Sequence, residues 1–191
     1  MQELEVLFGS KARPRILKLF FQNEGIFFTP KEVAKRCQIS QESARKELEK
    51  LSKINLFQQK TSQKGPSKER FYSLNPKFPY LAELRALVLT MPAFSFKELT
   101  SLFKKERNLK LVVLTGIFLK ENRSPVDLLI VSQKPRSSKI SKLVKKIESQ
   151  VGKEIKWSLM NVEEFNYRLE INDRFLKDIF DHNHKKIIDK I

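Results

Sequence analysis

Two residues near the middle of the sequence have the types and spacing of a catalytic centre, Gly116 and Asp127. Gly116 follows an apolar run over residues 109–115, and Asp127 lies near the start of a second apolar run, which ends at Ser132. Transfer chemistry that uses two Mg²⁺ ions needs several carboxylates around the ions. Residues two apart on a strand face the same side of a sheet, so a metal-binding pair would place acids at positions 125 and 127. Position 125 is a proline, whose side chain cannot bind a metal ion.

The order of elements around these two residues resembles the polymerase-beta-type nucleotidyltransferases. In that family a strand, a Gly-Ser turn and an Asp-x-Asp pair hold two metal ions. In this chain Ile117 stands where the resemblance places the serine. The third acid is expected on a strand around Lys156, where only Glu154 carries a carboxylate. The resemblance therefore implies a nucleotidyltransferase-like domain over residues 109–191 that is not an enzyme. Gly116 and Asp127 would be the remains of its site.

The first 75 residues show a different order of elements, that of a helix-turn-helix. An apolar face at helical spacing runs over residues 15–22. Residues 29–32 (Thr-Pro-Lys-Glu) have the pattern of a capping box with proline at the first helical position. A tight turn then ends at Ser40, the predicted N-cap of an amphipathic helix over residues 41–54. Two short helices joined by a three-residue turn are typical of a helix-turn-helix.

A β-hairpin is predicted directly after these helices. Residues 56–60 and 70–74 are strand-like, and the polar, basic stretch between them contains a Gly-Pro breaker. A further short strand is expected at residues 26–28. The whole segment resembles the winged-helix transcriptional regulators of bacteria and archaea. The resemblance implies that the helix over residues 41–54 enters the major groove of DNA and that the hairpin lies along flanking phosphates.

The candidate DNA-binding residues are polar or basic and lie on the solvent side of this helix and hairpin. Glutamine and arginine can read base edges, whereas lysine and serine contact phosphates. Glu42 and Glu49 on the same helix repel phosphate, and a solvated helix face without a ligand is the alternative interpretation. The predicted DNA-binding residues are Ser40, Gln41, Ser43, Arg45, Lys46, Lys50, Lys60, Lys64, Lys68 and Arg70.

The composition favours an anionic partner. The chain of 191 residues has 38 basic and 22 acidic residues, and the resulting net charge of +16 attracts polyanions. Nucleic acid is the first candidate and an anionic membrane the second. No apolar run reaches the ~18 residues of a membrane-spanning helix, and the N-terminus lacks the features of a secretory signal. The sole cysteine, Cys37, is expected to be a free buried thiol, which fits a cytoplasmic protein.

Neither a metal ion nor a cofactor is predicted. The only histidines, His182 and His184, lie one residue apart in a predicted turn without cysteine neighbours. The basic loop over residues 134–139 could contact nucleic acid, although loops of this type are most often solvated.

The middle of the chain is predicted to be a connector of two helices. A strongly apolar helix over residues 80–91 would pack between the two domains or against its copy in a dimer, and both arrangements stay open. A second capping box, Ser95 to Glu98, starts a helix to about residue 107 with Phe96 pointing inward.

The sequence thus predicts an α+β protein with three parts: a winged helix-turn-helix over residues 1–75, connector helices over 76–108 and an inactive nucleotidyltransferase-like domain with a small mixed sheet over 109–191. The predicted function is that of a sequence-specific transcriptional regulator whose C-terminal domain serves dimerisation, partner binding or ligand sensing. The expected partners are double-stranded DNA and a second copy of the chain, with a protein partner left open and no membrane. The alternatives are an active nucleotidyltransferase that holds its substrate with the winged helix, and an antitoxin-like protein-interaction module.

Overall fold

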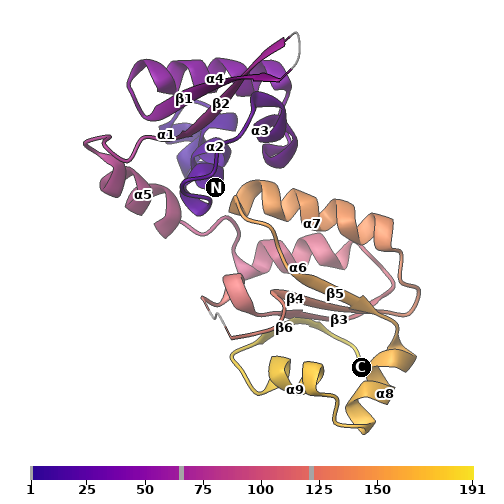
Figure 1. Cartoon of the computed structure of the whole chain (residues 1–191). Coiled ribbons are helices and arrows are strands. Elements are labelled where there is room, and N and C mark those ends of the chain that lie inside the picture. Colours follow the sequence, from indigo (N-terminus) through magenta and orange to yellow (C-terminus); the bar gives the residue numbers. More distant parts are fainter. Residues whose placement is uncertain (1, 65–66, 121–122) are drawn as a thin grey trace. The chain divides into compact units, whose positions relative to one another are not determined.

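The computed structural model describes residues 2–64, 67–120 and 123–191, without the side chains of residues 2, 63, 64 and 67. The fold belongs to the predicted α+β class and divides into two compact units (Figure 1). Unit 1 consists of Met1–Ala93 and Lys145–Lys153, and unit 2 of Phe94–Val144 and Glu154–Ile191. Each unit has its own hydrophobic core. Within the described residues, none of the helices combines the length and the apolar character that crossing a membrane requires.

Unit 1 is built from helices and a single hairpin. Its elements are α1 (Gln2–Leu7), α2 (Ala12–Gln22), α3 (Pro30–Cys37), α4 (Gln41–Lys53), β1 (Phe57–Lys64), β2 (Ser67–Leu74) and α5 (Leu81–Thr90). The predicted helix-turn-helix and hairpin are therefore confirmed as secondary structure. The strand expected at residues 26–28 is wrong, because only Phe28 pairs there, in an isolated bridge to Tyr72. Helix α1 was not predicted; its six residues bury Leu4 and are too short to show a helical period.

Local hydrogen bonds set the boundaries of α3 and α4. The capping box at α3 is complete, since Thr29 Oγ1 accepts from the Glu32 amide at 3.2 Å and Glu32 Oε2 accepts from the Thr29 amide at 2.7 Å. Gln38 ends α3 in the left-handed conformation, with φ of 51°, and turns the chain into α4. Ser40 then caps α4, because its hydroxyl oxygen accepts from the Ser43 amide at 3.1 Å.

The core of unit 1 centres on Phe20 of α2. Its ring is completely buried and lies edge-on to Phe28, with ring centroids 5.4 Å apart. It also contacts Phe57 at the base of β1, with centroids 4.4 Å apart. One side chain thus joins α2, the Phe28 bridge and the hairpin, so the hairpin is anchored by the same core that holds the helices.

Burial shifts the pKa of two ionisable side chains in this unit, Lys18 and Cys37. Lys18 of α2 is 2% exposed and donates a hydrogen bond of 2.9 Å from Nζ to the Met91 carbonyl. Burial lowers the pKa of Lys18 from 10.5 to about 8. Cys37 is a buried free thiol, as predicted, and burial raises its pKa to about 12. In both cases burial disfavours the charged form relative to the unfolded chain.

Replacing Lys18 by methionine is expected to change how stability depends on pH. Between pH 8 and 10.5 the unfolded chain keeps the Lys18 proton that the folded chain has lost, so this residue makes the folded state more stable as the pH rises. The free energy of unfolding of the wild type, relative to Lys18→Met, is expected to rise by about 2 kcal/mol between about pH 7 and pH 10. Urea unfolding of both proteins measures this difference, from which the Cys37 contribution cancels. If the difference between the two free energies of unfolding did not change with pH, the lowered pKa of Lys18 would be contradicted.

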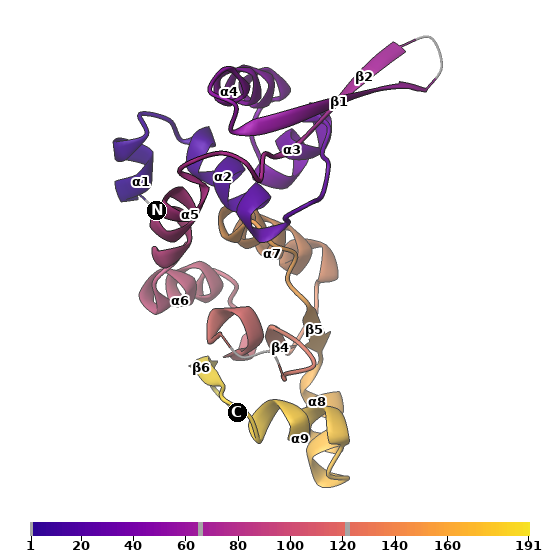
Figure 2. The ribbon, with the colours of Figure 1, turned by 60° about the vertical axis from the view of Figure 1, so that its left-hand side comes forward.

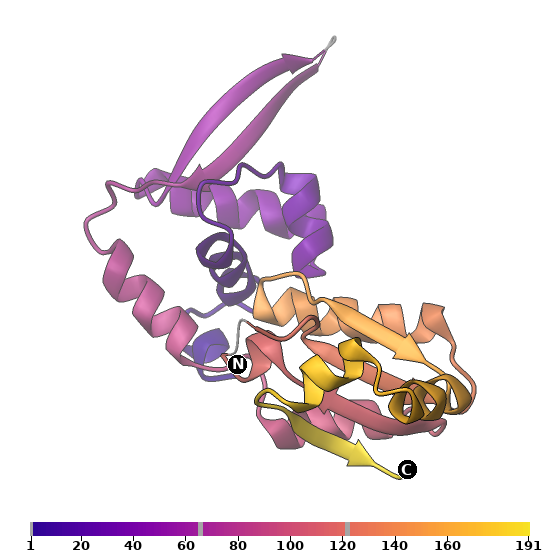
Figure 3. The same ribbon diagram turned by 60° about the horizontal axis from the view of Figure 1, so that its bottom comes forward.

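Unit 2 combines helices with a four-stranded mixed sheet. Its elements are α6 (Phe96–Lys104), β3 (Leu109–Leu114), the 3-10 turn η1 (Gly116–Phe118), β4 (Leu128–Ser132), α7 (Ser137–Val151), β5 (Trp157–Met160), α8 (Val162–Glu170), α9 (Arg174–Phe180) and β6 (Lys185–Asp189); α7 belongs to unit 1 from Lys145 on. The strand order is β5-β4-β3-β6. Strand β3 is antiparallel to both β4 and β6, and β4 is parallel to β5. Helices α8 and α9 cover one face of the sheet, burying Phe165, Leu176 and Ile179 against β3 and β4 (Figures 1 and 3).

The two predicted connector helices belong to different units. Helix α5 buries Val88 completely in the core of unit 1 and leaves Leu87 42% exposed. Helix α6 belongs to unit 2, and its capping box is present as predicted. The expectation that Phe96 points inward is wrong, because its ring is 39% exposed and Lys185 Nζ lies 4.2 Å from its centroid. The division of the chain into segments 1–75, 76–108 and 109–191 remains a prediction.

Candidate nucleic-acid interface

Helix α4 presents a polar face to solvent because its apolar residues all fall on the other side. Ala44, Leu48 and Leu51 are buried in the unit 1 core. Gln41 and Arg45 are one turn apart and both exposed. The remaining predicted residues of this helix are Ser40, Lys46 and Lys50, which are exposed, and Ser43, which is half-buried. The predicted α4 residues are therefore accessible at least in part, although Ser40 already uses its hydroxyl to cap the helix.

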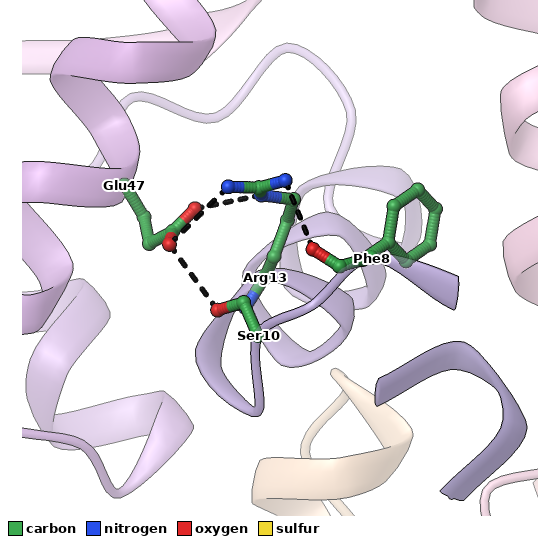
Figure 4. A network of polar contacts seen from close by, with 4 residues as sticks. All are labelled: Phe8, Ser10, Arg13 and Glu47. Atoms are coloured by element: carbon green, nitrogen blue, oxygen red, sulfur yellow. Dashed lines mark hydrogen bonds and ion pairs between the residues drawn. The ribbon is translucent and has the colours of Figure 1, made fainter. Parts of the chain in front are cut away.

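A partly buried ion pair between Glu47 and Arg13 fixes the orientation of α4 (Figure 4). Glu47 is 8% exposed, and its Oε2 lies 2.8 Å from Arg13 Nε of α2. Ser10 Oγ donates to Glu47 Oε1 at 3.2 Å, and Arg13 Nη1 donates to the Phe8 carbonyl at 3.1 Å. The sequence analysis missed this group, because Glu47 looks like one more charge on a charged helix. The available signal was its position within the apolar side of α4, between Ala44 and Leu48.

The charge of Lys46 is partly satisfied within the helix. Its Nζ lies 2.7 Å from Glu42 Oε1, one turn before it, and both side chains are mostly exposed. The hydrogen bond between them raises the pKa of Lys46 and lowers that of Glu42. A phosphate must therefore compete with Glu42 for this ammonium group, which weakens Lys46 as an anion contact.

Replacing Glu42 by glutamine is expected to strengthen binding to duplex DNA. The substitution removes one negative charge and frees Lys46, so we expect about a tenfold gain in affinity for any sequence and a steeper salt dependence by about one unit. Fluorescence anisotropy with a labelled duplex measures both quantities. Glu24→Gln removes an acid of unit 1 outside α4 and the hairpin, and it serves as the control. An affinity unchanged by Glu42→Gln would contradict the placement of α4 against phosphates.

The hairpin divides its predicted residues between two faces. Residues paired across an antiparallel hairpin share a face, and neighbours along a strand alternate. Arg70 pairs with Thr61 and Lys68 with Gln63, so Arg70 and Lys68 lie on the same face. Lys60 belongs to the opposite face, where its Nζ lies 4.3 Å from the ring centroid of Phe27. The side chain of the other predicted residue, Lys64, lies outside the described residues. Figures 2 and 3 show that the hairpin extends beyond α3 and α4.

Helix α3 adds two cations that the sequence analysis did not include. Lys31 and Lys35 are exposed and lie one turn apart. In a helix-turn-helix the first helix of the motif crosses the DNA backbone, so basic residues on its outer face are suited to phosphate contacts. This rule could have identified them from the sequence once α3 was recognised.

The two residues of the candidate catalytic centre in unit 2 are adjacent but engaged in structural contacts. Asp127 is 8% exposed; its Oδ1 accepts from the Ile117 amide at 2.8 Å and its Oδ2 from the Lys156 amide at 2.9 Å. Gly116 has φ of +50°, and a methyl group added there would overlap with Asp127 Oδ1. The carboxylate thus joins η1, the start of β4 and the chain just before β5.

Among the described residues, Asp127 is not part of a carboxylate cluster. Across the described residues, no group of three or more His, Cys, Asp or Glu side chains could hold a metal ion. His182 and His184 turn their Nδ1 atoms toward the Asp178 and His182 carbonyls, at 2.7 and 2.9 Å. The buried Asp127 carboxylate therefore links neighbouring segments of the sheet by accepting hydrogen bonds from their backbone amides.

Comparison with known proteins found no matching family model and no matching curated protein. Two solved structures are similar to part of the chain. A "possible transcriptional regulator" from Methanosarcina mazei Go1 has 14% identity and a TM-score of 0.37, and the match covers 55% of this chain and 86% of that one. A cysteine-to-serine mutant of ZitR from Lactococcus lactis has 19% identity and a TM-score of 0.34, with 51% of this chain and 60% of ZitR covered. At these TM-scores neither likeness carries an argument about this chain.

Proposed function

We propose that this chain is a sequence-specific transcriptional regulator that binds double-stranded DNA through α3, α4 and the β1–β2 hairpin of unit 1. The observation that carries the proposal is the exposed face of α4, where Gln41 and Arg45 follow the Ser40 cap. The opposite face of the same helix is fixed by the core and by the Glu47–Arg13 pair. A rigidly held helix with an open polar N-terminal half is what major-groove recognition needs.

Each part of this surface has a distinct role in the proposal. Gln41 can pair with an adenine edge and Arg45 with a guanine edge. Ser40, Ser43, Lys46 and Lys50 contact phosphates beside the groove. Lys68 and Arg70 share a hairpin face and contact the flanking backbone, with Lys31 and Lys35 of α3 doing the same. Lys60 lies on the other hairpin face, against Phe27, and would reach the DNA backbone only from that side; Lys64 stays a proposed backbone contact of the hairpin.

Unit 2 is proposed to be catalytically inactive. The support is that both oxygens of Asp127 accept hydrogen bonds from backbone amides. The position two residues earlier is Pro125, and the side chain of Lys156 is exposed near the same end of the sheet. We propose that this unit serves dimerisation, partner binding or ligand sensing, with a second copy of the chain as the expected partner.

Selection of bound duplexes from a random pool, followed by substitution, tests the proposed function. The selection is expected to enrich a defined sequence. Arg45→Ala should then cost about 1–3 kcal/mol at one base position and relax the preference there. Lys68→Ala should weaken all sequences alike and reduce the salt slope by about one unit. Lys77→Ala removes an exposed cation outside this surface and is the matched control. A pool without enrichment, or a preference unchanged by Arg45→Ala, would refute the proposal.

A further inference from the structure

The positive charge of unit 2 is concentrated in one place. This unit contains 18 Lys and Arg against 12 Asp and Glu residues. Residues 104–108 and 133–142 hold seven of those basic residues and only one acid, Glu106. The rest of the unit, with 11 basic and 11 acidic residues, is neutral. All of the net charge of unit 2 therefore comes from these 15 residues.

The two charged segments are distant in the sequence but joined in the fold. The carbonyl of Asn108, after α6, accepts from the Gln133 amide at 2.9 Å. It also accepts from Ser132 Oγ, at the end of β4, at 3.1 Å. Glu106, Arg136 and Lys139 line the same small hollow of about 30 Å³. The fold therefore places the two segments next to each other, and we call their basic residues the unit 2 basic patch.

The cations of the patch are available to a ligand. All of its basic side chains are exposed, and within the described part of the chain none of them forms an ion pair. They are Lys104, Lys105, Arg107, Lys134, Arg136, Lys139 and Lys142. Seven like charges held together repel one another, and this repulsion is relieved by a polyanion.

We propose that the unit 2 basic patch binds the phosphodiester backbone of duplex DNA, as a second contact that shares no residue with the interface in unit 1. Several separate cations suit a polymer of phosphates better than a single anion. The patch contains no aromatic residue, so it lacks the stacking platform that single-stranded nucleic acids require. The large aliphatic side chain of the patch segments, Ile140, is 3% exposed and cannot enter a membrane.

The experiment compares two triple substitutions in the full chain. The variant Lys105→Gln, Arg136→Gln, Lys139→Gln neutralises three cations of the patch, taken from both segments. The variant Lys156→Gln, Lys177→Gln, Lys190→Gln removes the same charge from exposed positions of unit 2 outside it. Affinity for a labelled random-sequence duplex of about 30 base pairs is measured between about 50 and 250 mM salt. The patch variant is expected to bind at least about tenfold more weakly, with a salt slope shallower by about two to three units.

Three results would overturn the proposal. Equal losses in both triple variants would show that only net charge matters. Competition by a single-stranded oligonucleotide as effective as by duplex would exclude a duplex site. Loss of retention on phosphatidylserine vesicles with unchanged DNA affinity would assign the patch to a membrane. Circular dichroism melting of each variant confirms that it is folded. The selected sequence preference is expected to survive in the patch variant and to change in Arg45→Ala, so failure of this proposal is distinguishable from failure of the interface in unit 1.

Discussion

Replacing Phe20 by alanine is expected to lower the free energy of unfolding of unit 1 by about 3–5 kcal/mol. The ring is fully buried and contacts Phe28 and Phe57, so its removal leaves a cavity where α2, the Phe28 bridge and the hairpin meet. Domains of this size are stable by about 5–15 kcal/mol, so the substitution would remove a large part of that stability. Urea unfolding followed by circular dichroism measures the loss.

Phe96 provides the matched control for this substitution. It is also a phenylalanine, but it is 39% exposed and its ring contacts a lysine side chain. Phe96→Ala is expected to cost about 1 kcal/mol or less. Similar losses from Phe20→Ala and Phe96→Ala would contradict the central position of Phe20 in the core.

Replacing Gly116 by alanine is expected to destabilise unit 2 by about 3 kcal/mol. An alanine in the left-handed conformation costs about 1–2 kcal/mol. Displacement of Asp127 also leaves buried amides without a hydrogen-bond acceptor, which costs about 1–3 kcal/mol. The added methyl group would overlap with Asp127 Oδ1, which accepts from the Ile117 amide. Unfolding of unit 2, followed by the fluorescence of Trp157, measures the effect.

Two variants separate the backbone cost from the clash. Gly25 also has a positive φ, of +74°, but an added methyl group meets nothing within 4 Å, so Gly25→Ala should cost only about 1 kcal/mol. The double variant Gly116→Ala, Asp127→Ala should lose less stability than the sum of its single substitutions, by about 1 kcal/mol or more, because the methyl group then has room. Strict additivity would contradict the direct contact between these two residues.

The parts of the fold that could be predicted are those coded by neighbouring residues. Both capping boxes and the Ser40 cap depend on spacings of three residues, and the structure has them where they were predicted. The hairpin follows from polar residues and a Gly-Pro breaker between two strand-like segments. The exposed face of α4 follows from the period of its apolar residues.

The parts that could not be predicted depend on contacts distant in the sequence. Glu47 lies 34 residues from Arg13, so the spacing within α4 gives no sign of the pair. The hydrogen bond that the Lys156 amide donates to Asp127 exists only because β4 and β5 are parallel neighbours. Phe96 was expected to point inward because of its apolar character. Its ring is nevertheless 39% exposed, and Lys185 of β6, distant in the sequence, lies against it.

The measurement that tests the central claim most directly is a salt titration of duplex binding by the full chain, in a variant where binding depends mainly on the interface in unit 1. It uses the chain with Lys105→Gln, Arg136→Gln and Lys139→Gln, so that the unit 2 basic patch contributes little, and the duplex enriched by selection. A log–log slope of roughly −4 or steeper is expected, together with a loss of preference when Arg45→Ala is added. A flat salt response, with affinity indifferent to Arg45, would contradict the assignment of this surface to double-stranded DNA.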